Sequence, residues 1–330
     1  MTALVTGSAG HLGEALVREL RDRGEAVRGL DVQPSPWTDC VGSVVDRDVL
    51  RTALAGVDTV FHAATLHKPH VATHTKQAFV DTNVSGTLAV LEEGIRAGVR
   101  RVIFTSTTSA FGAALRPPAG APAVWVTEAL RPVARNVYGV TKIAAEELCE
   151  LIHRREGLPV LILRTARFFP EVDDDEARRA ALADGNLKVL EFLNRRASLE
   201  DVVAAHLCAR DRAEALGFGR WIVSATSPFR SEDAARLRGD LAAVLEERLP
   251  GSVEALAALG WATLPGLDRV YDASAARRDL GWRPADDFTT VLERVRRTGD
   301  WRGSLARAVG AKGYHDRVFE EGPFPVEEER

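Results

Sequence analysis

The sequence predicts an α/β protein with a doubly wound parallel sheet and a smaller C-terminal substrate lobe. Short runs rich in β-branched residues alternate with longer helical patterns through the first half of the 330-residue chain, which is typical of βαβ units. The turn TGSAGHLG, at 6–13, lies between the first run and the first helical pattern. A glycine-rich turn in this place is typical of a Rossmann-type, dinucleotide-binding sheet.

The individual elements follow from hydrophobic spacing and from the residues that end them. We expect helices over 14–23, which Gly24 ends, and over 76–97, which Gly98 ends, because glycine often follows the last helical residue. Further helices are expected over 136–155 and 198–215. Short apolar runs predict strands at 3–6, 26–31, 59–63, 101–106, 160–164 and 220–224. Residues 171–185 lack a strand period and predict a short helix or a mobile flap, and the charged residues 327–330 are expected to be frayed.

Composition argues against several classes of function. The formal net charge is −4, so the chain has no broad basic field and we expect no nucleic acid partner. No apolar run has the length of a membrane span, and the first residues lack the charged lead and apolar stretch of a signal peptide. The three cysteines are scattered and form no CxxC pair, as in a reducing compartment. We therefore expect a cytoplasmic protein without membrane contact.

The glycine turn has the properties that a bound pyrophosphate requires. Gly7 permits the tight turn, Gly10 lets the backbone approach the phosphates, and Gly13 allows a close contact between helix and strand. The N–H groups at the start of the helix then face the negative phosphates. The spacing is GxxGxxG, where GxGxxG is commoner. We expect the cofactor to contact Gly7, Ala9, Gly10, His11, Leu12 and Gly13.

Two acidic residues bear on the adenosine half of such a cofactor. Asp31 ends the second expected strand, where a carboxylate accepts hydrogen bonds from the ribose hydroxyls and repels a 2′-phosphate. No arginine follows it directly, so the sequence favours NAD over NADP. The alternative for Asp31 is a solvated turn residue. Asp46 could reach the adenine edge, with an ordinary helix cap as the alternative.

A tyrosine and a lysine are spaced for acid–base chemistry. Tyr138 and Lys142 lie four residues apart, on one face of an expected helix. The pKa of a free tyrosine is about 10, too high for a good general base at neutral pH. A nearby Lys142 ammonium and an oxidised nicotinamide would favour the phenolate. Thr107 follows a strand, where its hydroxyl can hold a substrate oxygen. The alternative is a surface pair, since Tyr-x-x-x-Lys occurs in many helices.

In these residues the sequence resembles the extended short-chain dehydrogenase/reductases, the NAD-dependent epimerase/dehydratase family. The matching motifs run in order along the chain: TGSAGHLG (6–13), Asp31, HAA (62–64), Asn83 in DTNVSGT, FTSTTSAFG (104–112), Thr127-Glu128, YGVTK (138–142), LRTARFFP (163–170), SLEDVVAAH (198–206) and LGWRP (280–284).

The resemblance assigns roles to several of these positions. It implies Tyr138 as the acid/base, Lys142 as a ribose-binding and charge-tuning residue, and Thr107 as the active-site hydroxyl. It also implies that His62, Ala63 and Ala64 border the cofactor phosphates and ribose. Similar proteins often form homodimers through two helices, here 76–97 and 136–155.

Departures from the family pattern bear on the substrate. Thr108 and Ser109 follow Thr107 where family dehydratases carry an acidic pair, which argues against dehydration. Arg167 and Phe111 stand where nucleotide-sugar enzymes usually carry Asn and Tyr, and SLEDVV begins at 198, soon after Arg167. Members that bind a nucleoside diphosphate typically have a longer insertion there. We therefore expect a substrate smaller than a nucleotide sugar, such as a free sugar, a sugar acid or a similar polyol.

Candidate substrate contacts lie close to these motifs. They are Thr65, Lys68, Thr108 and Arg167. Arg178, Arg179, Arg195 and Arg196 lie near Arg167 in the sequence, and an arginine fork could bind a carboxylate or phosphate. The alternative for Arg178 and Arg179 is that they balance the acids at 171–176. His67, His70 and His74 have helix-like spacing, but we expect no metal because cysteine is absent nearby and acids are few.

These observations predict an NAD-dependent oxidoreductase that transfers hydride at a secondary alcohol carbon of a sugar-like or sugar-acid substrate. Residues 1–165 would form the NAD-binding domain, to which 198–225 return, and residues 166–197 and 226–330 would form the substrate-binding lobe. An epimerase that retains its cofactor is the alternative. A non-catalytic NAD-binding regulator is a third hypothesis, against which the presence of both Tyr138 and Lys142 argues.

Overall fold

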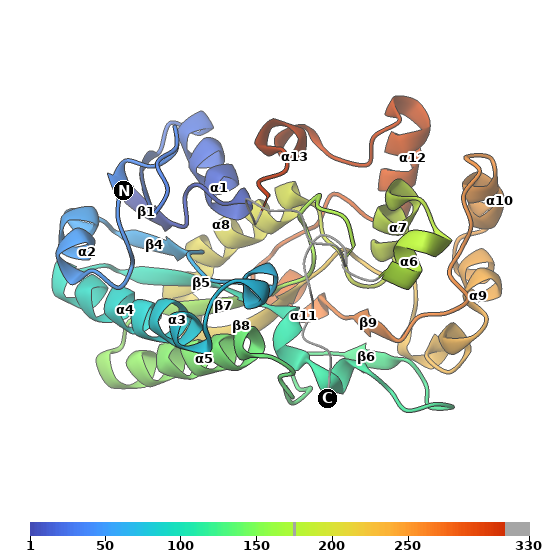
Figure 1. Ribbon diagram of the computed structural model, residues 1–330, viewed down its shortest axis with the longest axis horizontal. Helices are drawn as coiled ribbons and strands as arrows, with labels where there is room; N and C mark the ends of the chain where they lie inside the picture. Colours follow the sequence, from blue (N-terminus) through green and yellow to red (C-terminus); the bar gives the residue numbers. More distant parts are fainter. Residues whose placement is uncertain (174–175, 314–330) are drawn as a thin grey trace.

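Seven parallel strands form the central sheet of the computed structural model, which describes residues 1–173 and 176–313 (Figure 1). Their order is β3–β2–β1–β4–β5–β7–β8. The strands are β1 (Thr2–Thr6), β2 (Ala26–Asp31), β3 (Cys40–Val41), β4 (Thr59–His62), β5 (Arg101–Thr107), β7 (Val160–Thr165) and β8 (Phe218–Val223). The order reverses between β1 and β4, and ligands bind beyond the carboxyl ends of the strands at such a point. The predicted doubly wound sheet is confirmed.

Helices cover both faces of this sheet, and each face buries its own apolar cluster (Figure 1). One face carries α1 (His11–Asp22) and α8 (Leu199–Leu216). The other face carries α2 (Arg47–Leu54), α4 (Gly86–Ala97) and α5 (Val137–Glu156). β7 is buried along its whole length, as parallel strands between two helical layers are.

The long helix expected over 76–97 contains a π-helical turn. It runs as α3 (Lys76–Phe79), η2 (Val80–Ser85) and α4, and it ends at Gly98, whose φ is +77°. Helical spacing in the sequence does not distinguish this wider turn from an α-helix. Single π-turns are frequent at functional sites, and η2 carries the buried Asn83.

The smaller lobe has its own apolar cluster, which includes Phe192, Leu245 and Val291. Its helices are α6 (Glu176–Ala181), α7 (Asp184–Glu191), α9 (Leu241–Arg248), α10 (Ser252–Ala257) and α12 (Phe288–Thr298). A two-stranded parallel sheet joins β6 (Val124–Val126) to β9 (Arg269–Tyr271). β6 comes from the segment 1–165, and its pairing with β9 places it outside the large sheet.

Several elements differ from the sequence-based expectations. α1 begins at His11 rather than at residue 14, because Gly10 is its N-cap. The short strands β3, β6 and β9 were not expected, and the helices expected only in general terms beyond residue 231 include α11 (Ser274–Asp279) and α13 (Ser304–Val309). The expected frayed end, 327–330, and residues 174–175 of the expected flap lie outside the described residues. Within 1–173 and 176–313, every helix is too short or too polar to cross a membrane.

Two distant motifs meet at one buried tryptophan. Trp282 of LGWRP is fully buried, and its indole N–H donates to the Asp201 carbonyl of α8 at 3.0 Å. The Asp201 carboxylate in turn accepts the N–H groups of Ala285 (2.7 Å) and Asp286 (3.0 Å). These bonds fasten the C-terminal part of the chain to the helix that covers the sheet.

Replacing Trp282 should therefore weaken the whole fold. We expect Trp282→Ala to lower the free energy of unfolding by about 3–5 kcal/mol, since it leaves a large cavity and removes a buried hydrogen bond. Urea denaturation monitored by circular dichroism measures this loss. Trp37→Ala, at a partly buried position, is the matched control and should cost clearly less. Equal losses in the two variants would contradict this account.

Candidate active site

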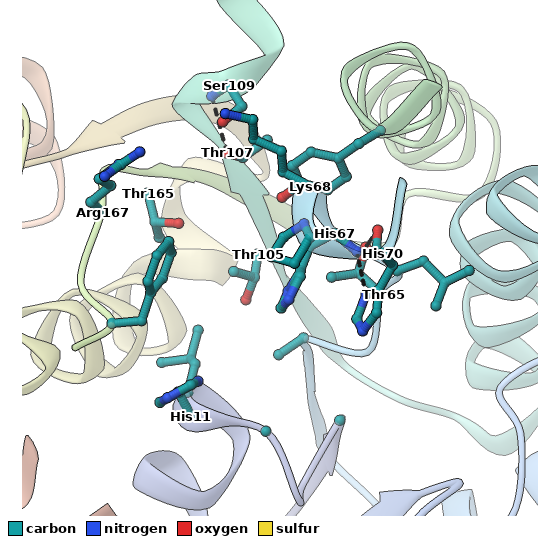
Figure 2. Close-up of a pocket in the computed structure, with 18 of the residues that line it drawn as sticks. His11, Thr65, His67, Lys68, His70, Thr105, Thr107, Ser109, Thr165 and Arg167 are labelled. Carbon is teal, nitrogen blue, oxygen red and sulfur yellow. Dashed lines mark hydrogen bonds between the residues drawn. The ribbon is translucent and has the colours of Figure 1, made fainter. Parts of the chain in front are cut away.

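A cavity of about 1290 Å³ opens at the carboxyl ends of the central strands. Pockets for small ligands usually measure about 300–1,000 Å³, so this cavity has room for a dinucleotide together with a smaller molecule. In Figure 2, His11 lies at one end, with Thr165 and Arg167 on one side, Thr65, His67 and His70 on the other, and Thr107 and Ser109 at the far end.

The glycine turn of 6–13 fits a pyrophosphate. Gly7 has a φ of +76°, and a Cβ atom there would lie 2.8 Å from the backbone nitrogen of Ala64. A Cβ at Gly13 would lie 1.8 Å from the Gly7 carbonyl oxygen, so only glycine fits either position. α1 starts next to the cavity without a side-chain cap, and N–H groups at a helix start bind anions. All six turn residues expected at the cofactor line the cavity: Gly7, Ala9, Gly10, His11, Leu12 and Gly13.

His11 connects this turn to two later segments. Its Nε2 lies 2.8 Å from Glu171 Oε1, and the same oxygen accepts the N–H of Lys312 at 3.0 Å. The Lys312 amine pairs with Glu14 of α1. Burial raises the pKa of Glu171, but its hydrogen bond and charge interaction with His11 outweigh this effect and leave the pKa below its usual value. The sequence does not indicate this junction, because its members are about 160 and 300 residues from the turn.

Asp31 and Asp46 have different environments. Asp31 lines the cavity, and its two carboxylate oxygens accept the N–H groups of Ala9 and Gln33, each at 2.9 Å. Asp46 is the N-cap of α2, with its carboxylate accepting the N–H groups of Asp48 and Val49. Among the described residues that border the cavity, Asp46 is not present. The structure thus contains the helix cap that the sequence allowed for Asp46, and the contact with adenine stays a prediction.

The expectation for the HAA motif is also corrected at one position. Ala63 and Ala64 line the cavity, but His62 lies beneath it, with Nδ1 2.7 Å from the Thr6 hydroxyl and Nε2 3.0 Å from the Thr87 hydroxyl. Burial, with a smaller effect of the Lys142 charge, lowers the pKa of His62 to about 3. Both ring nitrogens are used within the chain, so His62 supports the cavity floor and does not border a cofactor.

Thr107 and Tyr138 meet on the cavity wall. Thr107 is the last residue of β5, and Tyr138 lies in the first turn of α5, which the Asn136 side chain caps by accepting the N–H of Gly139. Thr107 lies close enough to Tyr138 to affect the pKa of the phenol, and the Thr107 hydroxyl accepts the N–H of Ser109 at 3.0 Å. The structure thus brings together two of the three residues expected to be catalytic.

Lys142 lies one helical turn further along α5 and is buried. Its amine donates to the Thr105 carbonyl at 2.7 Å and lies 3.9 Å from the centre of the Phe104 ring. Burial lowers the pKa of Lys142 to about 7, although the Glu146 charge raises it. Burial also raises the pKa of Tyr138 to about 12, against the opposing effect of the Thr107 hydrogen bond. In the chain without a cofactor, desolvation therefore dominates the pKa of the phenol. Our expectation concerned Lys142 together with an oxidised nicotinamide, and it stays a prediction.

Glu146 is an ionisable group that the sequence analysis missed. It is fully buried, and its Oε1 accepts hydrogen bonds from the Ser106 hydroxyl at 2.5 Å and Arg164 Nε at 3.0 Å. Its Oε2 accepts Arg164 Nη2 at 2.6 Å and Arg220 Nε at 3.2 Å. The signal was present, since Glu146 follows Lys142 at the same spacing of four at which Lys142 follows Tyr138.

Asn83 has a positioning role that its motif alone did not reveal. Its Oδ1 accepts the Thr65 hydroxyl at 2.9 Å and the Leu66 N–H at 2.8 Å. Its Nδ2 donates to the Leu66 carbonyl (2.9 Å) and to the Thr141 hydroxyl (3.0 Å). Asn83 therefore fixes the cavity-lining segment at Thr65 to helix α5.

The arginines divide into cavity-lining and buried groups. Arg167 lines the cavity, but its Nη1 lies 2.7 Å from Asp173 Oδ2 and 3.5 Å from Glu191 Oε1. Arg195 pairs with the same two carboxylates, and the fully buried Arg196 pairs with Glu191. The charge of Arg167 is thus partly neutralised by the chain's own carboxylates, which the sequence did not indicate.

The remaining candidate residues lie along the same cavity. Thr65, Lys68 and Thr108 line it, and the Thr108 hydroxyl donates to the Thr165 carbonyl at 3.3 Å. His67 and His70 also line it, with their rings stacked 4.5 Å apart. In the part of the chain that the structure describes, no group of three or more His, Cys, Asp or Glu is placed to hold a metal ion.

Comparisons with known proteins agree with this geometry. A sequence model of the NAD dependent epimerase/dehydratase family matches residues 3–216. The L-arabinose 1-dehydrogenase (NAD(P)(+)) of Haloferax volcanii is 27% identical over 297 residues, which cover 88% of this chain and 98% of that protein. Sterol demethylase protein B of Methylococcus capsulatus is 33% identical over 232 residues, which cover 64% of this chain and 66% of that protein.

One solved structure is similar to this chain over most of the length of both chains. It is a short-chain dehydrogenase/reductase superfamily protein from Agrobacterium tumefaciens with bound NAD, with a TM-score of 0.66 and 26% identity over 91% of this chain and 98% of that one. The matched part of this chain spans only 40% of the length of one curated relative and 66% of the length of another. These likenesses define a family and leave the substrate open.

Two buried histidines should make stability depend on pH. Burial lowers the pKa of His62 to about 3 and that of His206 to about 4, from the usual 6.5. Below about pH 6.5 the unfolded chain binds protons at these positions while the folded chain does not, so their contribution is present above that pH and is lost as the pH falls. Between about pH 7 and pH 5, each histidine should cost about 2 kcal/mol of unfolding free energy.

Urea denaturation at several pH values measures this dependence. His62→Asn should remove about half of the loss of unfolding free energy that we assign to the two histidines between about pH 7 and pH 5. His74→Ala, at an exposed position, should keep the wild-type dependence. If His62→Asn showed the same pH dependence as the wild type, the buried neutral state of His62 would be refuted.

Proposed function

The chain belongs to the NAD-dependent epimerase/dehydratase family, and on that premise we propose that it transfers hydride between NAD and a secondary alcohol carbon of a small sugar-like or sugar-acid substrate, with Tyr138 as acid/base. Membership makes it an NAD-dependent enzyme of the extended short-chain dehydrogenase/reductase type. The observation that carries the proposal is that Thr107 and Tyr138 both line the cavity, with Thr107 close enough to affect the pKa of the phenol and Lys142 one helical turn further along α5.

The residues that would hold NAD are grouped at one end of the cavity. The turn from Gly7 to Gly13 would bind the pyrophosphate, Asp31 the adenosine ribose, and Ala63 and Ala64 would border the cofactor. When bound, NAD supplies the hydride acceptor of the reaction. Asp31 is already fixed by the N–H groups of Ala9 and Gln33, which keeps its carboxylate at the edge of the cavity.

The chain's own residues would handle the substrate oxygen and its proton. Thr107 would hold the hydroxyl oxygen beside the Tyr138 phenol, and Tyr138 would accept the hydroxyl proton during oxidation or return it during reduction. The high pKa of Tyr138 in the chain alone suits the proton-donating direction. Positive charge brought close to the phenol would favour the proton-accepting direction, and Lys142 would hold the nicotinamide ribose.

The proposal of a small substrate rests on the short segment between β7 and α8 and on one relative. The Haloferax protein is named for its action on L-arabinose, a free sugar. We favour a dehydrogenase over an epimerase because this segment offers little to hold a bulky nucleotide during rotation of an intermediate. Thr108 and Ser109 line the cavity after Thr107, and hydroxyls there do not supply the carboxylic acid of a dehydratase.

We also propose a homodimer through α5 and the helix beside it. Val80, Val140 and Leu151 are large apolar side chains with exposed fractions of 38%, 55% and 41%. They lie on η2 and α5, the two helices that the family resemblance associates with dimers. A cytoplasmic location remains a proposal that rests on three free cysteines.

Absorbance at about 340 nm tests the activity. Wild-type protein mixed with NAD and a panel of sugars and sugar acids should produce NADH. Tyr138→Phe should abolish turnover, at least about 100-fold, because general acid–base catalysis contributes about 10²–10⁴-fold. Affinity for NAD should change little in this variant, which fluorescence titration checks.

The outcomes of this assay separate the hypotheses. NADH already bound to the purified protein would favour the epimerase. Turnover that persists in Tyr138→Phe would show that another group moves the proton. NAD binding without turnover of any alcohol in the wild type would favour the non-catalytic regulator. Tyr271→Phe, at another cavity-lining tyrosine, is a matched control that should retain the proton-transfer step.

Asp31 should determine the choice between NAD and NADP. Asp31→Ala removes the carboxylate that repels a 2′-phosphate, so the ratio of kcat/KM for NAD to that for NADP should fall by about 10-fold or more. Steady-state kinetics with both cofactors measures the ratio. Asp46→Ala is the control, since Asp46 caps α2 outside the cavity lining. An unchanged ratio in Asp31→Ala would mean that the ribose is recognised elsewhere.

A further inference from the structure

A buried histidine of α8 contacts one hydroxyl in the wall of the active-site cavity. Thr105 lies on β5, two residues before Thr107, and it lines the cavity. Figure 2 shows it between the His11 end of the cavity and Thr107. Its Oγ1 lies 2.9 Å from Nε2 of His206, which is fully buried on α8. The proton transfer proposed for this site does not involve this pair.

The hydrogen bonds of the histidine determine which of its nitrogens carries the hydrogen. His206 Nδ1 lies 2.7 Å from the Val202 carbonyl oxygen, which can only accept, so Nδ1 is the donor. Burial lowers the pKa of His206 to about 4, against the opposing effect of the bond to Val202, so the ring is neutral at neutral pH. A neutral imidazole has one donor and one acceptor. Nε2 is therefore the acceptor, and the Thr105 hydroxyl donates its only hydrogen to it.

This arrangement makes the Thr105 oxygen an acceptor toward the cavity. A hydroxyl has one hydrogen and two lone pairs, and His206 takes the hydrogen. Within residues 1–173 and 176–313, the bond to His206 is the one hydrogen bond that this hydroxyl makes. A ligand that contacts the Thr105 oxygen must therefore present an N–H or O–H group. A threonine without such a histidine could rotate its hydroxyl and bind a donor or an acceptor equally well.

The backbone and the side chain of Thr105 are bonded to opposite faces of the sheet. Its carbonyl accepts the amine of Lys142 from α5, whereas its side chain bonds to α8 on the other face. Lys142 is the residue proposed to hold the nicotinamide ribose. Between its pyrophosphate and its reacting carbon, NAD has one further donor besides the ribose hydroxyls, the NH2 group of the nicotinamide carboxamide. This group is therefore the one left for the Thr105 oxygen.

We propose that Thr105 accepts a hydrogen bond from the nicotinamide carboxamide, and that His206, by taking the threonine hydrogen, selects the NH2 end of the carboxamide over its oxygen. The inference rests on the proposed function for the position of the nicotinamide beside Thr107 and Tyr138. The carboxamide is attached to the ring carbon next to the one that carries the hydride, so this contact orients the ring toward the alcohol. His206 is thus a positioning residue that acts through Thr105.

Two cofactor analogues test this contact. 3-Acetylpyridine adenine dinucleotide has a methyl group in place of the carboxamide NH2 and keeps the carbonyl oxygen, whereas thionicotinamide adenine dinucleotide keeps the NH2. Each is titrated calorimetrically into the full chain without substrate, so binding is measured independently of turnover. We expect the acetylpyridine analogue to bind about 3- to 10-fold more weakly than NAD, because a neutral hydrogen bond is lost. The thio analogue should bind within about 2-fold of NAD, because its donor is retained.

Variants assign this discrimination to the threonine. Thr105→Val keeps the shape and removes the hydroxyl, so the ratio of the dissociation constants of the acetylpyridine analogue and NAD should fall to about 1, and Thr105→Ser should retain it. Thr82→Val is the matched control at another cavity-lining threonine and should keep the wild-type ratio. The ratio is taken within each variant, so a general loss of NAD affinity cancels. Equal binding of the two cofactors to the wild type, or a ratio that persists in Thr105→Val, overturns the inference.

A second pair of variants tests the histidine. His206→Phe removes the acceptor, so the Thr105 hydroxyl can rotate and donate to the carbonyl oxygen of the acetylpyridine analogue, and the ratio should fall toward about 1. His206→Gln, whose amide oxygen can still take the threonine hydrogen, should retain part of the ratio. Thermal melting establishes that the variants are folded. A wild-type ratio in folded His206→Phe would show that His206 only fills space beneath β5.

The outcomes separate this inference from the proposed function. Discrimination that depends on Thr105, without NADH formation from any alcohol, would contradict the proposed reaction and retain the contact. NADH formation together with equal binding of NAD and the acetylpyridine analogue would retain the reaction and contradict the contact. Equal binding of these cofactors together with a raised KM for the alcohol in Thr105→Val would assign the donor at Thr105 to the substrate, and the carboxamide assignment would be wrong.

Discussion

The position of helix α5 depends on one buried carboxylate. Glu146 accepts hydrogen bonds from Ser106 of β5, Arg164 of β7 and Arg220 of β8, so a single side chain joins the helix to three strands. Removing one partner from a buried ion pair typically costs about 3–5 kcal/mol. Tyr138 precedes Glu146 by eight residues, about two helical turns. The phenol is therefore placed at the end of β5, near Thr107, by an ionic contact deep in the sheet.

The two functional groups of α5 are shifted in opposite directions by the same physical effect. Burial disfavours charge, so it raises the pKa of Tyr138 to about 12 and lowers that of Lys142 to about 7. The shift of the tyrosine corresponds to about 3 kcal/mol against the phenolate. Tyr-x-x-x-Lys spacing alone does not overcome this cost, and the Glu146 charge instead helps Lys142 to remain protonated. The motif thus supplies the geometry, while burial sets the direction of both pKa shifts in the chain without a cofactor.

Local patterns in the sequence predicted the elements whose structure depends mainly on residues close to them in the sequence. The glycine turn, the central strands and the row of Tyr138 and Lys142 have signals within a few residues, and the structure contains them. β6 and β9 have three residues each and pair across about 140 residues, so neither has a periodic signal. The pattern before α2 allowed both a helix cap and an adenine contact for Asp46, and only the fold shows that the cap forms. The ion pairs of Arg167 with Asp173 and Glu191 could not be predicted either, because Glu191 is 24 residues away in the sequence.

The contrast between the cavity's two ends explains why family membership leaves the substrate open. The cofactor end consists of backbone and small residues that any member needs, since a Cβ atom at Gly7 or Gly13 would collide with the backbone. The lobe end is built from segments after β7, and only part of it falls within the 3–216 that the family model matches. Arg269 and Tyr271 lie beyond that match, on a strand fixed by Asn194. A shared fold does not fix the ligand, so relatives named for sterols and for sugars can both match this chain, and the residues that would distinguish their substrates have to be sought at the lobe end of the cavity.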